Sequence, residues 1–192
     1  MNTGLDRKEL ESEMVRMGVN DPVVLKARNR SKAAHAGQVR DDGRPYATHP
    51  AEVVRILVDR GHTKPEVLAA AYLHDVLEDT KVTRDALLAE FGEAIVGIVD
   101  EVTNIGPPGR AFAEKQAALL EHAKWMSTGA KLVKLADRLH NLGDMRNWPR
   151  WKQLRYALAT FELLNALQPV PDPGLAEDVR VCARDVVDRD IE

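Results

Sequence analysis

The sequence has little of what a disulfide-bonded, membrane-spanning or nucleic-acid-binding protein needs. It contains one cysteine, Cys182, which excludes a disulfide framework and a cysteine-based zinc site. The longest apolar run, Val67–Leu73, is too short to span a bilayer, and Met1–Glu11 lacks the apolar core of a signal peptide. The formal net charge is −3, which gives no electrostatic footprint for nucleic acid. We therefore expect a cytoplasmic protein with no membrane or nucleic-acid partner, whose metal ions are held by histidines and carboxylates.

Strand signals are also scarce, because β-branched residues are scattered and Asp42-Gly43 is flanked by charges and indicates a loop. Apolar residues recur instead at helical spacing, with turn-forming residues between the segments. The sequence predicts an all-α helical bundle of about eight to ten helices. The expected helices are residues 5–17, 22–35, 49–60, 63–79, 85–91, 94–102, 111–125, 131–143, 149–167 and 175–187. Asp21, Thr63 and Thr83 are the expected caps of the second, fourth and fifth of these helices.

The length of 192 residues suits one domain with a short appendage. We assign residues 1–168 to the main domain. We assign residues 169–192 to a proline-rich linker and a C-terminal helix packed on the same domain.

The segment after residue 66 organises the rest of the chain. Val67–Tyr72 carries no charge, which indicates a buried helix. If that helix continues, His74, Asp75, Glu78 and Asp79 fall within one arc of about 140°. Carboxylates crowded into an apolar setting repel each other and lose hydration, and a divalent metal would remove that cost. The alternative is a helix end that simply emerges into water.

Four residues have the right chemistry for such a metal: His49, His74, Asp75 and Asp137. Two imidazoles and two carboxylates fit Mn²⁺, Fe²⁺, Co²⁺ or Zn²⁺, and the four residues lie on three separate helices, as in metal sites of helical bundles. Asp137 lies opposite the apolar stripe of its helix, so a solvated polar face is the alternative there.

Two further carboxylates, Glu78 and Asp79, follow one turn beyond the first ligands. They could orient or deprotonate a water molecule bound to the metal. The remaining histidines are expected to have structural roles only. His35 is expected at a helix end, and His62, His122 and His140 are expected on the surface.

Four segments carry a family resemblance. They are Ala34–Pro50 (AHAGQVR…PYATHP), Leu73–Thr80 (LHDVLEDT), Phe91–Thr103 (FG…VDEVT) and Lys131–Leu142 (KLVKLADRLHNL). In this order they resemble the hydrolase domain of Rel/Spo-type alarmone enzymes, whose HDxxED motif the second segment matches. The similarity runs from about residue 23 to residue 165. There is no room for the synthetase and regulatory domains of the long enzymes, so the chain looks like a stand-alone small alarmone hydrolase.

The resemblance implies an HD-domain fold and Mn²⁺-dependent removal of the 3′-pyrophosphate from (p)ppGpp, with one Mn²⁺ per chain. It also implies a role for each matching residue. The metal ligands would be His49, His74, Asp75 and Asp137, the water-activating pair would be Glu78 and Asp79, and the substrate contacts would be Arg40 (on the base), Asn141, Lys152 and Tyr156.

One departure concerns the base. The family usually has a second basic residue after the arginine, and this chain has Asp41. Both (p)ppGpp and (p)ppApp therefore remain candidate substrates, and a homo-oligomer remains open. A general HD-domain nucleotide phosphohydrolase, acting as a nucleotidase or NADPH phosphatase, is the alternative enzyme. A non-catalytic alarmone-binding module is the alternative from another class.

Overall fold

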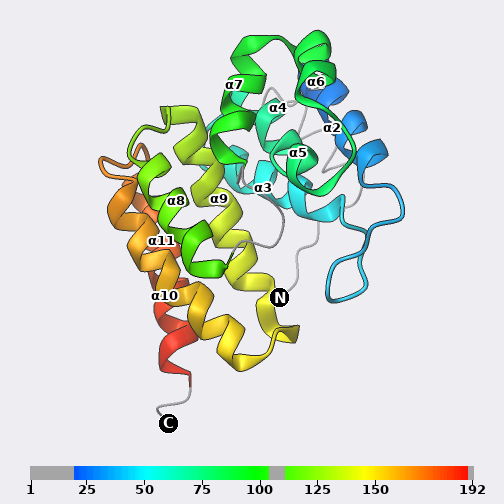
Figure 1. Cartoon of the computed structure of the whole chain (residues 1–192). Coiled ribbons are helices and arrows are strands. Elements are labelled where there is room, and N and C mark those ends of the chain that lie inside the picture. The colour runs from blue at the N-terminus through cyan, green and yellow to red at the C-terminus, as the bar shows by residue number, and fades with distance from the viewer. Residues whose placement is uncertain (1–19, 104–110, 190–192) are drawn as a thin grey trace.

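The structure, a computed structural model, describes residues 20–103 and 111–189. Figure 1 shows that these residues form helices joined by turns and loops. The described residues contain no strand, only an isolated bridge between Val39 and Pro45. The expected all-α architecture is therefore confirmed. The helix expected at residues 5–17 lies outside the described residues.

The helix bounds follow the expected ranges closely, with one exception treated below. The elements are α2 (Pro22–Ala34), α3 (Thr48–Asp59), α4 (Pro65–Leu73), α5 (Val76–Asp79), α6 (Arg84–Phe91), α7 (Glu93–Val102), α8 (Phe112–Ala123), α9 (Thr128–Asp144), the 3₁₀ helix η1 (Met145–Asn147), α10 (Arg150–Ala166) and α11 (Pro173–Asp188).

Side-chain caps begin several helices. The carboxylate of Asp21 accepts a hydrogen bond from the backbone of α2, and the hydroxyl of Thr83 does the same for α6, as the sequence predicts. The cap expected from Thr63 on α4 is wrong, because α4 begins after Lys64 without a side-chain cap. Pro65 at the first helical position starts that helix instead.

Helix α4 lies at the centre of the core. Every residue from Val67 to Leu73 is buried, and α4 packs against α2, α3, α7 and α9. This burial on all sides explains why the segment carries no charge.

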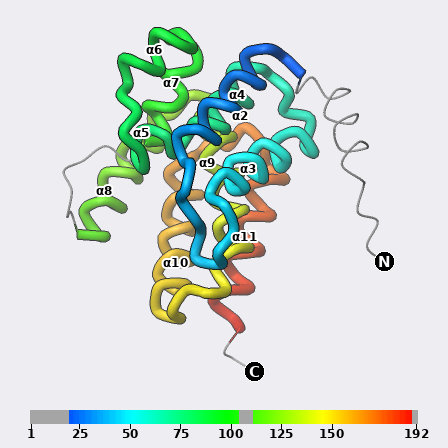
Figure 2. The backbone as a smooth tube through the Cα atoms, turned by 90° about the vertical axis from the view of Figure 1, so that its right-hand side faces the viewer, coloured from blue at the N-terminus to red at the C-terminus, as the bar shows by residue number. Residues whose placement is uncertain are grey.

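Helix α9 joins this core to the C-terminal helices. It packs on α3, α4 and α7 and also on α11, which in turn packs along α10 (Figure 2). The buried residues of α11 include Leu175, Val179 and Val186, spaced on one face. Residues 49, 74 and 137 thereby meet on α3, at the end of α4 and on α9. No described helix is both long enough and apolar enough to cross a membrane.

Candidate metal centre

The HD pair lies in a break between two helices. The sequence predicts one helix to residue 79, but α4 ends at Leu73 and α5 begins at Val76. The imidazole of His74 is bonded through Nδ1 to the Ala71 carbonyl at 2.8 Å. In a continued helix that carbonyl would accept from the amide of Asp75. The expected continuous helix is therefore wrong, and His74 and Asp75 lie in the break between α4 and α5.

Four potential ligand atoms converge at this break. Nε2 of His49 lies 3.1 Å from Nε2 of His74 and 3.4 Å from Oδ2 of Asp75. The same Asp75 oxygen is 3.1 Å from Nε2 of His74. Oδ1 of Asp137 lies 3.2 Å from Nε2 of His49 and 3.7 Å from Nε2 of His74. The structure thus brings together all four side chains that the sequence singles out.

These spacings fit a single metal ion. Ligand atoms about 2.1 Å from a common metal are separated by about 3.0–3.6 Å at angles between 90° and 120°. The ligand atoms of His49, His74 and Asp75 all lie within 4.8 Å of one another. Nitrogen and carboxylate oxygen donors suit a borderline divalent cation, and the donor set therefore fits the group that the family implies.

Second contacts orient both imidazoles. Because the Ala71 carbonyl can only accept, Nδ1 of His74 carries the hydrogen, which leaves Nε2 free to bind a metal. Nδ1 of His49 lies 2.8 Å from Nδ1 of His140. The expectation that His140 is a surface residue is therefore wrong. Its position three residues after Asp137, on the same helix face, is the signal that could have identified it.

The electrostatics of the cluster favour a bound cation. Burial lowers the pKa of His74, but the carboxylates of Asp75 and Asp137 outweigh it and raise that pKa to about 10. The pKa values of both carboxyls are held below their usual range, because the two imidazoles outweigh the effect of burial. Burial lowers the pKa of His140 to about 4, so this ring is neutral and can accept a hydrogen from His49. A cation would replace the proton on His74.

The polar face of α9 is buried and not solvated. Lys134, Asp137 and Arg138 are each at most 9% exposed. The ammonium of Lys134 donates to the Val102 carbonyl at 3.0 Å, and the guanidinium of Arg138 lies 4.2 Å from the centre of the Tyr156 ring. The apolar stems of these long side chains fill space between helices while their charged ends find partners. This burial favours a functional role for Asp137.

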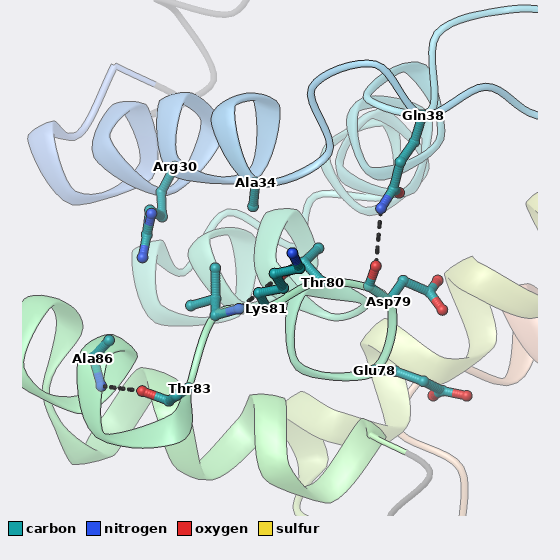
Figure 3. Close-up of a pocket in the computed structure, with 10 residues that line it drawn as sticks. Arg30, Ala34, Gln38, Glu78, Asp79, Thr80, Lys81, Thr83 and Ala86 are labelled. Carbon is teal, nitrogen blue, oxygen red and sulfur yellow. Dashed lines mark hydrogen bonds between the residues drawn. The ribbon is translucent and has the colours of Figure 1, made fainter. Parts of the chain in front are cut away.

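The acidic pair of α5 lies next to the cluster. The hydroxyl of Tyr46 is 2.6 Å from Oδ2 of Asp75 and 3.0 Å from Oδ2 of Asp79, so it bridges the two carboxylates. Partial burial and the charge of Asp75 raise the pKa of Asp79. A groove of about 860 Å³ runs beside α5 and is lined by Arg30 on α2 as well as by Glu78 and Asp79. Figure 3 shows that the side chains of Glu78 and Asp79 point away from Arg30.

The candidate base-binding arginine is tied to the end of α9. Nε of Arg40 donates to Asp144 at 2.8 Å, and its Nη2 donates to Asn141 at 3.1 Å. The amide of Asn141 donates to Oδ1 of Asp137 at 2.6 Å. Arg44 also pairs with Asp144 at 2.5 Å. A chain of polar contacts therefore runs from the loop between α2 and α3 to the candidate metal ligands.

The other expected substrate residues lie around this chain. Lys152 sits over the Trp148 ring, 3.8 Å from its centre, and 4.0 Å from a carboxylate oxygen of Asp41. The indole of Trp148 donates to Asp41 at 2.5 Å. Tyr156 packs edge to face on Trp148, and burial raises its pKa to about 12. Sequence reasoning missed Trp148 and Asp144, which carry no motif of their own.

Comparison with known proteins shows the family to which this chain belongs. The family model described as "HD domain" matches residues 27–167, and adjoining His74 and Asp75 lie within that match. The chain belongs to the HD-domain family, in the Rel/Spo-homologue group that includes the MESH1 proteins. Binding of a divalent metal is a property of this family.

Particular relatives carry functional names. A Xenopus tropicalis protein named guanosine-3′,5′-bis(diphosphate) 3′-pyrophosphohydrolase MESH1 is 40% identical over 133 residues, which are 68% of this chain and 73% of the relative. A Mycobacterium leprae protein named probable GTP pyrophosphokinase is 37% identical over 150 residues. That alignment covers 77% of this chain but only 19% of the relative.

A solved structure shares the fold. It is described under the words "a metazoan ortholog of SpoT hydrolyzes ppGpp and plays a role in starvation responses". The TM-score is 0.78 at 28% sequence identity, and the match covers 86% of this chain and 96% of that chain.

Proposed function

We propose that this protein is a metal-dependent hydrolase that removes the 3′-pyrophosphate from the alarmone nucleotides (p)ppGpp or (p)ppApp and releases pyrophosphate. One observation carries the proposal. The ligand atoms of His49, His74, Asp75 and Asp137 converge beside Asp79, in a chain that aligns with 73% of a relative named for this reaction.

We assign the four converging side chains to one divalent ion and propose Mn²⁺, because mixed imidazole and carboxylate ligands suit it. Such an ion polarises the phosphoryl oxygens and lowers the pKa of a bound water. The protein's part is to hold Nε2 of His74 free by its bond from Nδ1 to Ala71 and to supply the negative charge of the two aspartates.

Glu78 and Asp79 are assigned to the proton taken from the attacking water. A carboxylate with a raised pKa is a better proton acceptor near neutral pH, and the pKa of Asp79 is raised. Tyr46 links the Asp79 carboxylate to Asp75, a member of the cluster.

Arg40 is assigned to the face of the nucleobase, where a planar guanidinium stacks well. Asn141, Lys152 and Tyr156 are assigned to the ribose and phosphates. The negative charge of Asp41 is compensated in this region. Its carboxylate accepts a hydrogen bond from the Trp148 indole and lies near the ammonium of Lys152. Asp41 therefore gives no reason to exclude either (p)ppGpp or (p)ppApp, and the proposal includes both.

The test is incubation of the purified protein with Mn²⁺ and either ppGpp or ppApp, with pyrophosphate and the 5′-nucleotide measured separately. Pyrophosphate from either alarmone supports the proposal, and the ratio of the two rates gives the base preference. If neither alarmone yields pyrophosphate, the substrate class is wrong. Orthophosphate release from nucleoside monophosphates or NADPH would favour the general phosphohydrolase instead.

We also propose that residues 1–168 form the catalytic domain and that residues 169–192 support it. The packing of α11 against α9, which carries Asp137, is the observation in favour.

A further inference from the structure

The segment between α2 and α3 holds α5 at two points, and both points lie on Asp79. Nε2 of Gln38 donates to the Asp79 backbone carbonyl at 2.9 Å, the contact drawn as a dashed line in Figure 3. The hydroxyl of Tyr46 reaches the Asp79 carboxylate at 3.0 Å. Asp79 is therefore held at both its backbone carbonyl and its carboxylate.

His35 joins these two contacts. Its Nδ1 lies 2.8 Å from Oε1 of Gln38, and its ring stacks on Tyr46 with 4.5 Å between ring centres and 24° between planes. Because the Asp79 carbonyl can only accept, Gln38 must turn its NH₂ group to α5 and its oxygen to His35. Nδ1 of His35 must then carry the hydrogen.

The imidazole of His35 has no other hydrogen-bond partner among the described residues. Its side chain is 2% exposed, and its Nε2 is buried without a hydrogen-bond partner in that part of the chain. A buried polar ring that gives up one of its bonds must be held by the contacts it keeps. Gln38 and the Tyr46 ring are two of those contacts.

Helix α5 needs such support. It is a single turn of four residues, from Val76 to Asp79, and the N-cap residue Asp75 makes no side-chain cap bond. An isolated turn is unstable because its ordering costs more entropy than its one or two hydrogen bonds return. Its C-terminal carbonyls also lack partners within the helix. Gln38 supplies a partner from 41 residues away in the sequence.

We infer that His35, Gln38 and Tyr46 form a positioning unit that holds the Asp79 carboxylate beside the metal cluster, ready to accept the proton of the attacking water. This inference rests on the proposed hydrolase function. None of the three residues is a metal ligand, and none needs to touch the substrate. Gln38 contacts no candidate metal ligand, so its removal should affect turnover and not metal content or substrate affinity. Tyr46 also bonds to Asp75, so its removal should weaken metal binding as well as turnover.

Two variants and one matched control test the positioning unit. Gln38→Met keeps the size of the side chain and removes both hydrogen bonds. Tyr46→Phe keeps the stacking on His35 and removes only the hydroxyl. The control is Gln116→Met, because Gln116 on α8 makes the same kind of amide bond to a backbone carbonyl, that of Ala159, at 3.0 Å.

Three quantities are measured on each full-length variant: bound Mn²⁺ per chain, kcat and KM for pyrophosphate release, and hydrogen–deuterium exchange of residues 76–82. We expect Gln38→Met to exchange at least about tenfold faster in this segment, because α5 loses its C-terminal partner. At saturating Mn²⁺ we expect each variant to lose about tenfold or more in kcat with KM unchanged, and we expect Gln38→Met to keep the wild-type Mn²⁺ content. Gln116→Met should match the wild type in all three.

The possible results separate the two proposals. Unchanged exchange in Gln38→Met overturns the positioning unit, whatever the activity. Faster exchange with normal kcat in both variants overturns its role in catalysis. If the wild type releases no pyrophosphate from either alarmone, the hydrolase function fails, and the exchange data still decide whether α5 is held in this way.

Discussion

At the scale of single residues, the candidate metal ligands and the proposed proton acceptors occupy different positions. Asp137 approaches both imidazoles and is buried with them, whereas Glu78 lies on α5 beyond the cluster. Removing a ligand and removing a proton acceptor should therefore have different consequences.

We expect Asp137→Ala to lose both bound Mn²⁺ and activity, because two imidazoles and one carboxylate are left to hold the ion. Glu78→Ala should keep about one Mn²⁺ per chain and lose roughly 10²–10⁴-fold in kcat, the usual contribution of a general base. Metal analysis and steady-state rates check both variants. Asp59→Ala, which removes an exposed carboxylate on α3, is the control. Full metal content and normal rates in Asp137→Ala would refute the ligand assignment.

His74 links the stability of the metal-free protein to pH. Burial opposes its charge, but the two aspartates raise its pKa to about 10 in the folded state, compared with about 6.5 when unfolded. A pKa raised by folding gives stability that is complete below about pH 6.5 and lost as pH rises through about 10. We expect the Tm of the chelated protein to fall between pH 7 and pH 10.

Saturating Mn²⁺ should weaken this dependence, because the ion takes the place of the proton and stabilises the folded state. Thermal unfolding across the pH range, with chelator and with Mn²⁺, measures both effects. His74→Asn removes the titrating group and should flatten the metal-free profile. A wild-type Tm that stays constant from pH 7 to pH 10 without metal would contradict the account.

Among the structural elements, the loop between α2 and α3 carries Arg40, the residue proposed to contact the nucleobase. It lies against the end of α9 and η1 through Arg40, Arg44 and Asp41. The pair of Arg40 with Asp144 is only 12% and 18% exposed, so it contributes more than a typical surface ion pair. Asp144 therefore fixes the guanidinium of Arg40 beside Asn141, which in turn contacts Asp137.

We expect Asp144→Asn to raise KM for the alarmone about three- to tenfold, because Arg40 and Arg44 both lose a charged partner. The kcat should stay within about twofold, since Asp144 contacts none of the four candidate ligands in the described structure. Steady-state kinetics on ppGpp and ppApp test this. Asp59→Asn serves as the control for loss of an exposed pair. An unchanged KM would show that the loop is positioned by other contacts.

For the molecule as a whole, α4 supplies the centre of the packing on which the site depends. Leu68 is completely buried there, whereas Leu158 on α10 is 56% exposed. The same leucine truncation should therefore have very different costs at the two positions.

We expect Leu68→Ala to lower the free energy of unfolding by about 2–5 kcal/mol, through lost burial and the cavity left behind. Leu158→Ala should change it by less than about 1 kcal/mol. Urea denaturation followed by circular dichroism compares the two variants. Below the unfolding transition both should retain Mn²⁺. Equal losses in the two variants would mean that α4 is not the centre of the core.

Local pattern predicted most of the helices and the residue types at the site. Apolar spacing and capping residues such as Asp21 and Thr83 depend only on near neighbours, so they can be read from the chain. The break after Leu73 could not, because the bond from the His74 ring to the Ala71 carbonyl, which accompanies it, leaves no trace in the apolar spacing. The sequence also could not decide whether the polar face of α9 is buried or solvated. The spacing of lysine and arginine along a helix is the same in both cases.

The amino-acid order alone was enough to establish an all-helical chain with histidines and carboxylates suited to one divalent ion, because helix periodicity and ligand chemistry are local properties. The convergence of residues 49, 74, 75 and 137 required the packing of α3, α4 and α9. The same packing placed His140 behind His49 and brought Arg40 to Asp144, 104 positions away. Such contacts depend on how helices cross in space, and no periodicity within a single helix encodes that.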